Sequence, residues 1–227
     1  MTKPLPQAVL WDMDGTLVDT EPYWIDAERT LVERAGGEWT HADTEITVGA
    51  QLTFTAQHLR SKAPVPGTDD EIVQAMLELV IASVQALGVP WRPGALELLA
   101  SLAANGIPCA LVTMSYHSLA SVVAAELPGD YLRELVTGDQ VANGKPHPEP
   151  YLVAAARLGV APECCVALED SRTGVASAEA AGVPTIAIPL IAHIPAAPQR
   201  SRVRSLTEVD LDVLRQVVNG EAFDTLD

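Results

Sequence analysis

The sequence carries little positive charge. Its 227 residues include 14 lysines and arginines against 30 aspartates and glutamates, which gives a formal net charge of −16. Nucleic acids and anionic membrane surfaces bind basic patches on proteins, so we expect neither as a partner. A small anionic substrate would need a local cation to overcome this negative field. The composition therefore already favours a bound metal ion.

Cysteines and long apolar runs are also scarce. The three cysteines, Cys109, Cys164 and Cys165, all lie in apolar runs, and we expect reduced core thiols rather than a disulfide or a metal site. No apolar run reaches the roughly 18 residues that a membrane span needs. The first residues, MTKPLPQAVLWD, lack the apolar centre of a signal peptide. We therefore expect a soluble, cytoplasmic protein.

Apolar residues make up 48% of the chain, which is ample for a buried core. Short runs that are apolar on both faces alternate with helical patterns, as is typical of a parallel α/β sheet. The expected strands cover residues 8–11, 107–113, 134–138, 164–170 and 183–189. The expected helices cover 95–106, 118–127, 149–159, 174–182 and 206–220, and glycines are placed to end four of them: Gly106, Gly159, Gly182 and Gly220. We predict a Rossmann-like α/β core, with an exposed loop at 194–202.

Residues 20–91 interrupt this regular alternation. They contain no convincing strand but at least two amphipathic helices, near 24–35 and 69–88. Seventy residues are far too many for a loop between a strand and a helix. We therefore predict two domains, an α/β core made of 1–19 and 92–227 and an inserted helical cap made of 20–91.

Two aspartates directly follow the first expected strand, in the stretch DMDGTLVDT. In an extended segment Asp12 and Asp14 face the same side, so both carboxylates can point into one pocket. Gly15 then allows a sharp turn of the backbone. A hard cation such as Mg²⁺, which prefers oxygen ligands, would offset the repulsion between the two acids. The alternative is an acidic turn of the kind that commonly follows strands.

Polar residues also follow later strands, where ligands of α/β sheets bind. Glu169 and Asp170 end the expected strand at 164–170 and would share a metal with Asp12, although they also fit the start of a helix. Thr113 is either a phosphate-binding hydroxyl or a simple strand cap. Lys145, between Gly144 and Pro146, is either a fixed charge directed at a phosphate or a solvated surface lysine.

Together these groups suit phosphoryl transfer through a covalent carboxylate. Asp12 would attack phosphorus, and a protonated Asp14 would give its proton to the leaving oxygen and then deprotonate water. Lys145, Thr113, backbone amides and Mg²⁺ would stabilise the charge on the phosphoryl oxygens.

Four stretches then identify a family resemblance: DMDGTLVDT, LVTMS, GKPHPEPY and LEDSRTG resemble the four ordered motifs of the haloacid dehalogenase superfamily. The resemblance spans nearly the whole chain, including a helical cap inserted after the first strand. It is closest to the β-phosphoglucomutase-like and sugar-phosphate phosphatase subgroup.

The resemblance implies Asp12 as the nucleophile and Asp14 as the general acid and base. It also implies a Mg²⁺ ion held by Asp12, by the backbone carbonyl of Asp14 and by Asp170, with Glu169 helping through water. Dehalogenases proper lack the second aspartate because a halide leaves without protonation, so Asp14 argues against dehalogenation and phosphonate cleavage.

The resemblance further implies that Thr113 and Lys145 bind the phosphoryl group, with Ser115 near it. Asp19 and Thr20 would begin the hinge to the cap. Further candidates, each with a simpler structural interpretation, are the cap residues Glu21, Trp24, Gln51 and His58 and the turn residues His117 and His147. Trp11, where the family more often has phenylalanine, is interpreted as core packing.

One departure from the family pattern bears on the reaction. The mutases of this subgroup usually carry an arginine soon after a cap glycine, which holds the substrate's second phosphate. At Gly49 this chain reads VGAQLT, and the only basic residues of 20–91 are Arg29, Arg34, Arg60 and Lys62.

We therefore predict a Mg²⁺-dependent phosphatase that acts on a small phosphorylated metabolite, such as a sugar or polyol phosphate. The first alternative is a phosphosugar mutase. The second is a non-catalytic module that kept the fold, which the complete set of acids argues against. The sequence leaves the oligomeric state open, with a monomer as the simplest case.

Overall fold

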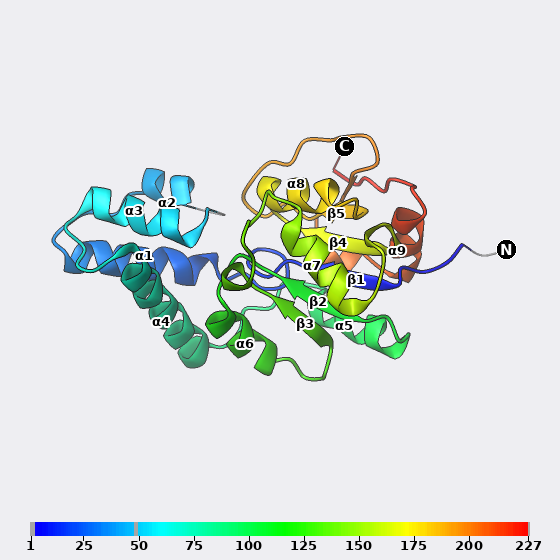
Figure 1. Ribbon diagram of the computed structural model, residues 1–227, viewed down its shortest axis with the longest axis horizontal. Coiled ribbons are helices and arrows are strands. Elements are labelled where there is room, and N and C mark those ends of the chain that lie inside the picture. The colour runs from blue at the N-terminus through cyan, green and yellow to red at the C-terminus, as the bar shows by residue number, and fades with distance from the viewer. Residues whose placement is uncertain (1–2, 48–49, 227) are drawn as a thin grey trace. The chain divides into compact units, whose positions relative to one another are not determined.

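The computed structural model describes residues 3–47 and 50–226, which form two compact units (Figure 1). The larger unit comprises the described parts of Met1–Asp19 and Trp91–Asp227, and the smaller unit runs from Thr20 to Pro90. Gly49 is the cap glycine of this chain that was compared with the mutases, which usually carry an arginine soon after theirs. It lies outside the described residues. Among the described helices, none is both long and apolar enough to cross a membrane.

The larger unit contains a six-stranded sheet in the order β3-β2-β1-β4-β5-β6, in which every neighbouring pair is parallel. The strands are β1 (Ala8–Trp11), β2 (Cys109–Val112), β3 (Leu132–Val136), β4 (Cys165–Glu169), β5 (Thr185–Ala187) and β6 (Ser201–Arg202). Every residue of β1, β2, β4 and β5 is buried, as expected for strands that are apolar on both faces. The predicted fold class is confirmed.

Helices α7 (Glu149–Leu158) and α8 (Arg172–Ala180) pack with the central strands in one apolar cluster (Figure 1). Small side chains such as Ala154 and Ala178 in this cluster allow the helices to approach the sheet closely. The remaining helices of the unit are α5 (Ala95–Ala104), α6 (His117–Ala125) and α9 (Leu211–Val218), with short 3₁₀ turns η1 (Gly138–Gln140), η2 (Pro162–Cys164) and η3 (Leu206–Glu208). Trp11 is fully buried, which confirms its role in core packing.

The glycines predicted to end helices all have positive φ: Gly106, Gly159, Gly182 and Gly220. They therefore adopt the left-handed conformation that glycine tolerates without steric cost. The three cysteines are free thiols in this structure, with Cys109 and Cys165 buried and Cys164 half-buried.

Three predicted segments need correction. The strand expected at 134–138 is shifted and runs from Leu132 to Val136. The helix expected at 206–220 starts only at Leu211, because the Asp210 side chain caps it by accepting hydrogen bonds from the backbone N–H groups of Asp212 and Val213.

The segment predicted as an exposed loop at 194–202 ends instead in the buried strand β6. Its arginine, Arg202, is buried because its Nε donates to Asp224 Oδ2 at 2.8 Å, which compensates the charge. A two-residue strand that contains a buried, paired arginine has no apolar pattern from which it could be predicted.

The smaller unit consists of helices α1 (Glu21–Arg34), α2 (His41–Thr47), α3 (Leu52–Lys62) and α4 (Asp69–Leu87). Helix α4 packs against both α1 and α3 and begins with a capping box between Thr68 and Glu71. The sequence singled out α1 and α4. Helix α2 carries buried polar residues, including Asp43 and Thr47, in place of an apolar stripe, so hydrophobic periodicity does not reveal it.

A buried carboxylate joins α2 to α3 in this unit. Asp43 accepts hydrogen bonds from the backbone N–H and the hydroxyl of Thr40, and its Oδ1 lies 3.0 Å from His58 Nε2 and 3.0 Å from Lys62 Nζ. Burial opposes ionisation of Asp43, but these hydrogen bonds hold the pKa of its carboxyl well below its usual range. His58 also meets the ring of Trp39 edge-on, so it is a structural contact rather than an ordinary surface histidine.

Candidate active site at the strand ends

The carboxyl ends of three neighbouring strands bring the predicted site residues to one edge of the sheet. β1 lies between β2 and β4, and Trp11 is in register with Leu111 on one side and Leu168 on the other. The residues that follow these strands therefore meet: Asp12 after β1, Thr113 after β2 and Asp170 after β4.

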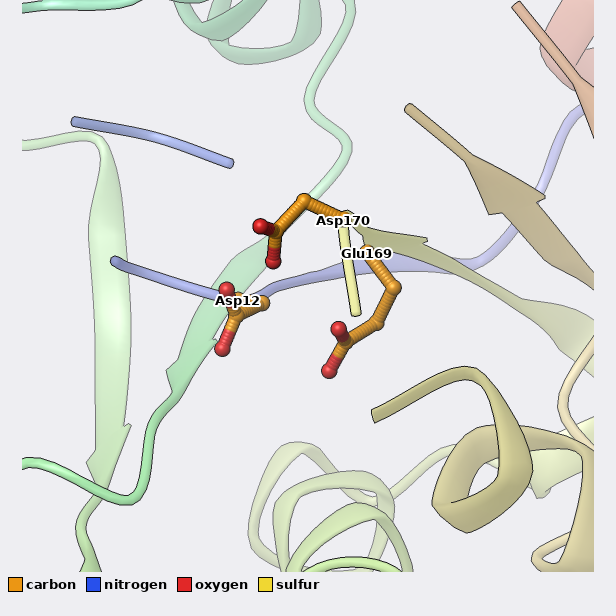
Figure 2. A group of neighbouring side chains, drawn as sticks. All are labelled: Asp12, Glu169 and Asp170. Carbon is orange, nitrogen blue, oxygen red and sulfur yellow. The ribbon is translucent and has the colours of Figure 1, made fainter. Parts of the chain in front are cut away.

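Three carboxylates converge there. One oxygen from each of Asp12, Glu169 and Asp170 lies within 4.8 Å of the others. Figure 2 shows Asp12 reaching this point from the end of β1, and Glu169 and Asp170 from the end of β4. Clustered carboxylate oxygens are the ligands that a hard divalent cation such as Mg²⁺ prefers, so this donor set fits the expected metal.

Two glycines pack directly against these acids. Gly15, with φ +91°, turns the backbone so closely under Asp170 that a Cβ at this position would lie 2.1 Å from Asp170 Oδ2. A Cβ at Gly174, in the first turn of α8, would lie 1.9 Å from Glu169 Oε2. The sharp turn expected at Gly15 is confirmed. The close packing of Gly174 against Glu169 was not predicted. The helix-capping role considered for the acids belongs to Ser171, which accepts a hydrogen bond from Gly174 N.

Lys145 is buried among the acids. Its Nζ lies 2.6 Å from Asp12 Oδ1, 2.6 Å from Glu169 Oε1 and 2.8 Å from the carbonyl oxygen of Val112. Burial alone would lower the pKa of this ammonium, but the two adjacent carboxylates raise the pKa above its usual value. The alternative of a solvated surface lysine is therefore wrong.

The negative charge of Asp12, unlike the positive charge of Lys145, is disfavoured by its surroundings. Burial first, and the nearby charge of Glu169 second, raise the pKa of the Asp12 carboxyl to about 7, although Lys145 acts in the opposite direction. A positive charge at this point would favour the ionised form, so the cluster is electrostatically suited to a cation.

Asp14 is held by two hydroxyls. Its Oδ2 accepts a hydrogen bond from Ser115 Oγ at 2.7 Å and a longer one from Thr113 Oγ1 at 3.3 Å. Thr113 Oγ1 in turn accepts from the backbone N–H of Ser115. The two hydroxyls expected near the phosphoryl group thus contact the neighbouring acid in this structure, and their contact with phosphate stays a prediction.

Tyr151 is a further residue of this site that the sequence did not single out. Its hydroxyl donates to Glu169 Oε1 at 2.6 Å, and its ring centroid lies 5.2 Å from Lys145 Nζ. The available signal was the last letter of GKPHPEPY, a phenol on the apolar face of the helix that follows Lys145.

The histidines near the motifs have local roles. His147 Nδ1 accepts a hydrogen bond from Glu149 N at the start of α7, in line with a local structural role for this turn residue. His117 begins α6, and its backbone N–H donates to Asp139. In the smaller unit, Trp24 is buried in α1, Glu21 is half-buried and Gln51 is exposed, and their proposed role in lining a pocket stays a prediction.

Fold and site together define a class of α/β enzymes with an acidic centre at the ends of a parallel sheet. The family model of haloacid dehalogenase-like hydrolases matches residues 6–182. The chain therefore belongs to this family, which confirms the resemblance of the four motifs.

Relatives of known activity cover most of the chain. Hexitol phosphatase A of Escherichia coli is 33% identical over 219 residues, which are 89% of this chain and 88% of that protein. Hexitol phosphatase B of the same organism is 31% identical over 185 residues, 80% of this chain and 83% of that protein. The crystal structure of CbbY from Rhodobacter sphaeroides in complex with phosphate superposes with a TM-score of 0.81 at 27% identity, covering 90% of this chain and 96% of that one.

Proposed function

We propose that this protein is a phosphatase that hydrolyses a small sugar or polyol phosphate through a phosphorylated Asp12. The observation that carries the proposal is the group at the strand ends, where Lys145 Nζ lies 2.6 Å from Asp12 Oδ1 beside two further carboxylates. A carboxylate fixed by a buried cation, next to a second acid held by hydroxyls, provides both a nucleophile and a proton donor.

In the first step an oxygen of Asp12 attacks phosphorus and the bond from phosphorus to the ester oxygen breaks. The electron pair goes to the leaving oxygen, which takes the proton of the Asp14 carboxyl. In the second step Asp14, now a carboxylate, removes a proton from water as the water oxygen attacks phosphorus. The bond to Asp12 then breaks, and inorganic phosphate leaves.

The remaining groups stabilise charge. Lys145 would balance negative charge on the phosphoryl oxygens, and the hydroxyls of Ser115 and Thr113 hold Asp14 by hydrogen bonds. We propose that Asp12, Asp170 and the carbonyl of Asp14 hold Mg²⁺, with Glu169 assisting. When bound, Mg²⁺ supplies positive charge that favours ionised Asp12 and withdraws charge from the phosphoryl group.

The substrate class is supported by the relatives. Two hexitol phosphatases and phosphoglycolate phosphatases of enteric bacteria are about equally similar to this chain, at 29–33% identity. Each name refers to a small phosphomonoester. We therefore propose a small substrate that carries one phosphate, with hexitol phosphates as the first class to test.

A phosphosugar mutase is the second candidate, since the family includes β-phosphoglucomutases. A mutase must hold two phosphates, and two of the four lysines and arginines of the smaller unit are already held in close ion pairs within it. Arg60 binds Asp69 at 2.6 Å, and Lys62 binds the buried Asp43 at 3.0 Å. These pairings favour the phosphatase.

A phosphate-release screen of several dozen phosphomonoesters, with Mg²⁺ and with a chelator, tests the proposal. We expect release from hexitol or related phosphates that needs Mg²⁺ and is abolished in Asp12→Asn. Asp130→Asn, an exposed acid of the same unit, serves as the control and should keep full activity. Asp12→Asn with parental activity would exclude the nucleophile, and conversion of β-glucose 1-phosphate to glucose 6-phosphate without phosphate release would favour the mutase.

A further inference from the structure

Tyr151 lies on the buried face of α7, at the end of the motif that carries Lys145. Its side chain is completely buried, and so is Glu169, whose Oε1 its hydroxyl contacts at 2.6 Å. A phenylalanine would fill the same space without having to bury a polar oxygen. The hydroxyl is therefore explained by the acid that it contacts rather than by packing.

Glu169 receives donors on both oxygens. Oε1 accepts from Tyr151 Oη and from Lys145 Nζ, both at 2.6 Å, and Oε2 accepts from Ser171 Oγ at 3.2 Å. Gly174 packs against the same carboxylate. Hydrogen bonds to an ionised acceptor are the stronger kind, so the phenol contributes to fixing the rotamer of this acid.

Lys145 depends on Glu169 for its own position. A lysine ammonium is a point charge on a flexible four-carbon stem, and it holds one place only where its partners hold it. Here the partners are Glu169, Asp12 and the carbonyl of Val112, and the face of the Tyr151 ring lies 5.2 Å away. Cations are attracted to the faces of aromatic rings at such distances.

We propose that Tyr151 is a positioning residue, whose hydroxyl fixes Glu169 and thereby holds the Lys145 ammonium against Asp12. Its importance for turnover rests on the proposed phosphatase function, but the placement of Lys145 can be tested without any substrate. Tyr151→Phe is the appropriate change because it removes one oxygen and keeps the ring.

The first measurement is NMR of the lysine side chains. The chain has three lysines, Lys3, Lys62 and Lys145, so ¹⁵N-lysine labelling gives a spectrum that Lys145→Met assigns by removing one signal. A buried ammonium between two carboxylates exchanges its protons slowly. We expect Tyr151→Phe to shift or broaden the Lys145 signal and to leave Lys62 unchanged. Tyr131→Phe, in the loop before β3, should change neither.

The second measurement is phosphate release. Loss of a hydrogen bond to a charged group that acts in the transition state lowers kcat by about tenfold or more. We expect this fall in Tyr151→Phe with KM changed by less than about threefold, because the ring and the binding groups remain. If Tyr151 acts through Glu169, adding Tyr151→Phe to Glu169→Ala should cause no further loss of kcat. If Glu169→Ala does not fold, Glu169→Gln can replace it. The coupling energy between the two substitutions should then be smaller but of the same sign.

The outcomes separate this inference from the function. An unchanged Lys145 signal in Tyr151→Phe would overturn the inference whatever the activity. A changed signal with parental kcat would overturn the role in turnover and leave the phosphatase intact. A parent that releases no phosphate from any ester would overturn the function, while the NMR comparison would still decide whether Tyr151 holds Lys145.

Discussion

Gly174 offers a sharp test of the site because two physical effects predict opposite results for Gly174→Ala. Gly174 lies in the first turn of α8, and alanine stabilises a helix relative to glycine by roughly 1 kcal/mol. Considered as a helix position alone, the substitution should stabilise the protein. The new Cβ, however, would lie 1.9 Å from Oε2 and 2.0 Å from Oε1 and Cδ of Glu169.

Atoms cannot remain so close, so Glu169 or α8 must move. Glu169 is fully buried and is held by Tyr151 and Lys145, so its carboxylate can move only by disturbing these contacts. Overpacking of a dense interior costs about 1–3 kcal/mol, and weakening a buried ion pair adds to this cost. We expect Gly174→Ala to lower the free energy of unfolding by about 2–4 kcal/mol, after the helix gain is subtracted.

Urea denaturation of the parent and Gly174→Ala measures this difference, with phosphate release as the second readout. Thr173→Ala is the matched control, because it adds alanine at the neighbouring, exposed position of the same helix. The control should be within about 0.5 kcal/mol of the parent. A Gly174→Ala protein that is more stable than the parent and fully active would refute the idea that Glu169 needs the space left by the missing side chain of Gly174.

The smaller unit supplies two further predictions. Burial raises the pKa of Glu28 from 4.5 to about 7, so the folded state keeps a proton that the unfolded chain releases, and stability falls as pH rises between these values. The stability of Glu28→Gln should lack this dependence on pH, and its free energy of unfolding in urea titrations should exceed that of the parent by on the order of 3 kcal/mol near pH 8. Glu33→Gln, on the exposed face of α1, is the control and should behave like the parent. Parallel curves of stability against pH for Glu28→Gln and the parent would contradict the prediction. The lowered pKa of Asp43 has the opposite sign: its stabilisation is present above its ordinary pKa and is lost as the pH falls. Asp43→Asn should therefore destabilise by about 1–3 kcal/mol near pH 7 and by less near pH 3 in thermal melts, and an equal loss at both pH values would rule out the charge of Asp43 as the cause.

The sequence predicts the strand ends well because two independent patterns agree there. The apolar runs locate β1, β2 and β4, and acids or hydroxyls follow each of them, so parallel pairing alone brings Asp12, Thr113 and Asp170 together. Lys145 is different. In the sequence alone it is typical of a surface lysine. Only the fold places its ammonium against the carbonyl oxygen of Val112 and makes it a buried ion.

Buried polar residues account for most of what the sequence does not predict. Tyr151, Glu28 and Asp43 occupy positions where hydrophobic periodicity expects either an apolar side chain or an exposed charge. The burial of Glu28 and Tyr151 is permitted by single partners far away in the sequence, Thr47 and Glu169, and Asp43 also relies on the more distant His58 and Lys62. No local pattern encodes such partners, so these residues are found only once the fold is known.

Electrostatics connects the composition of the chain to its proposed reaction. Asp12, Glu169 and Asp170 converge at the strand ends, where Lys145 contacts Asp12 and Glu169, in a chain whose net charge is −16. A phosphomonoester carries up to two further negative charges near neutral pH, and it would be repelled by this group of acids. Burial first, and the charge of Glu169 second, raise the pKa of Asp12 to about 7. One divalent cation would offset both effects at once, since it favours ionised Asp12 and attracts the phosphate. The acids therefore support the proposal of a site that accepts its anionic substrate only together with a metal.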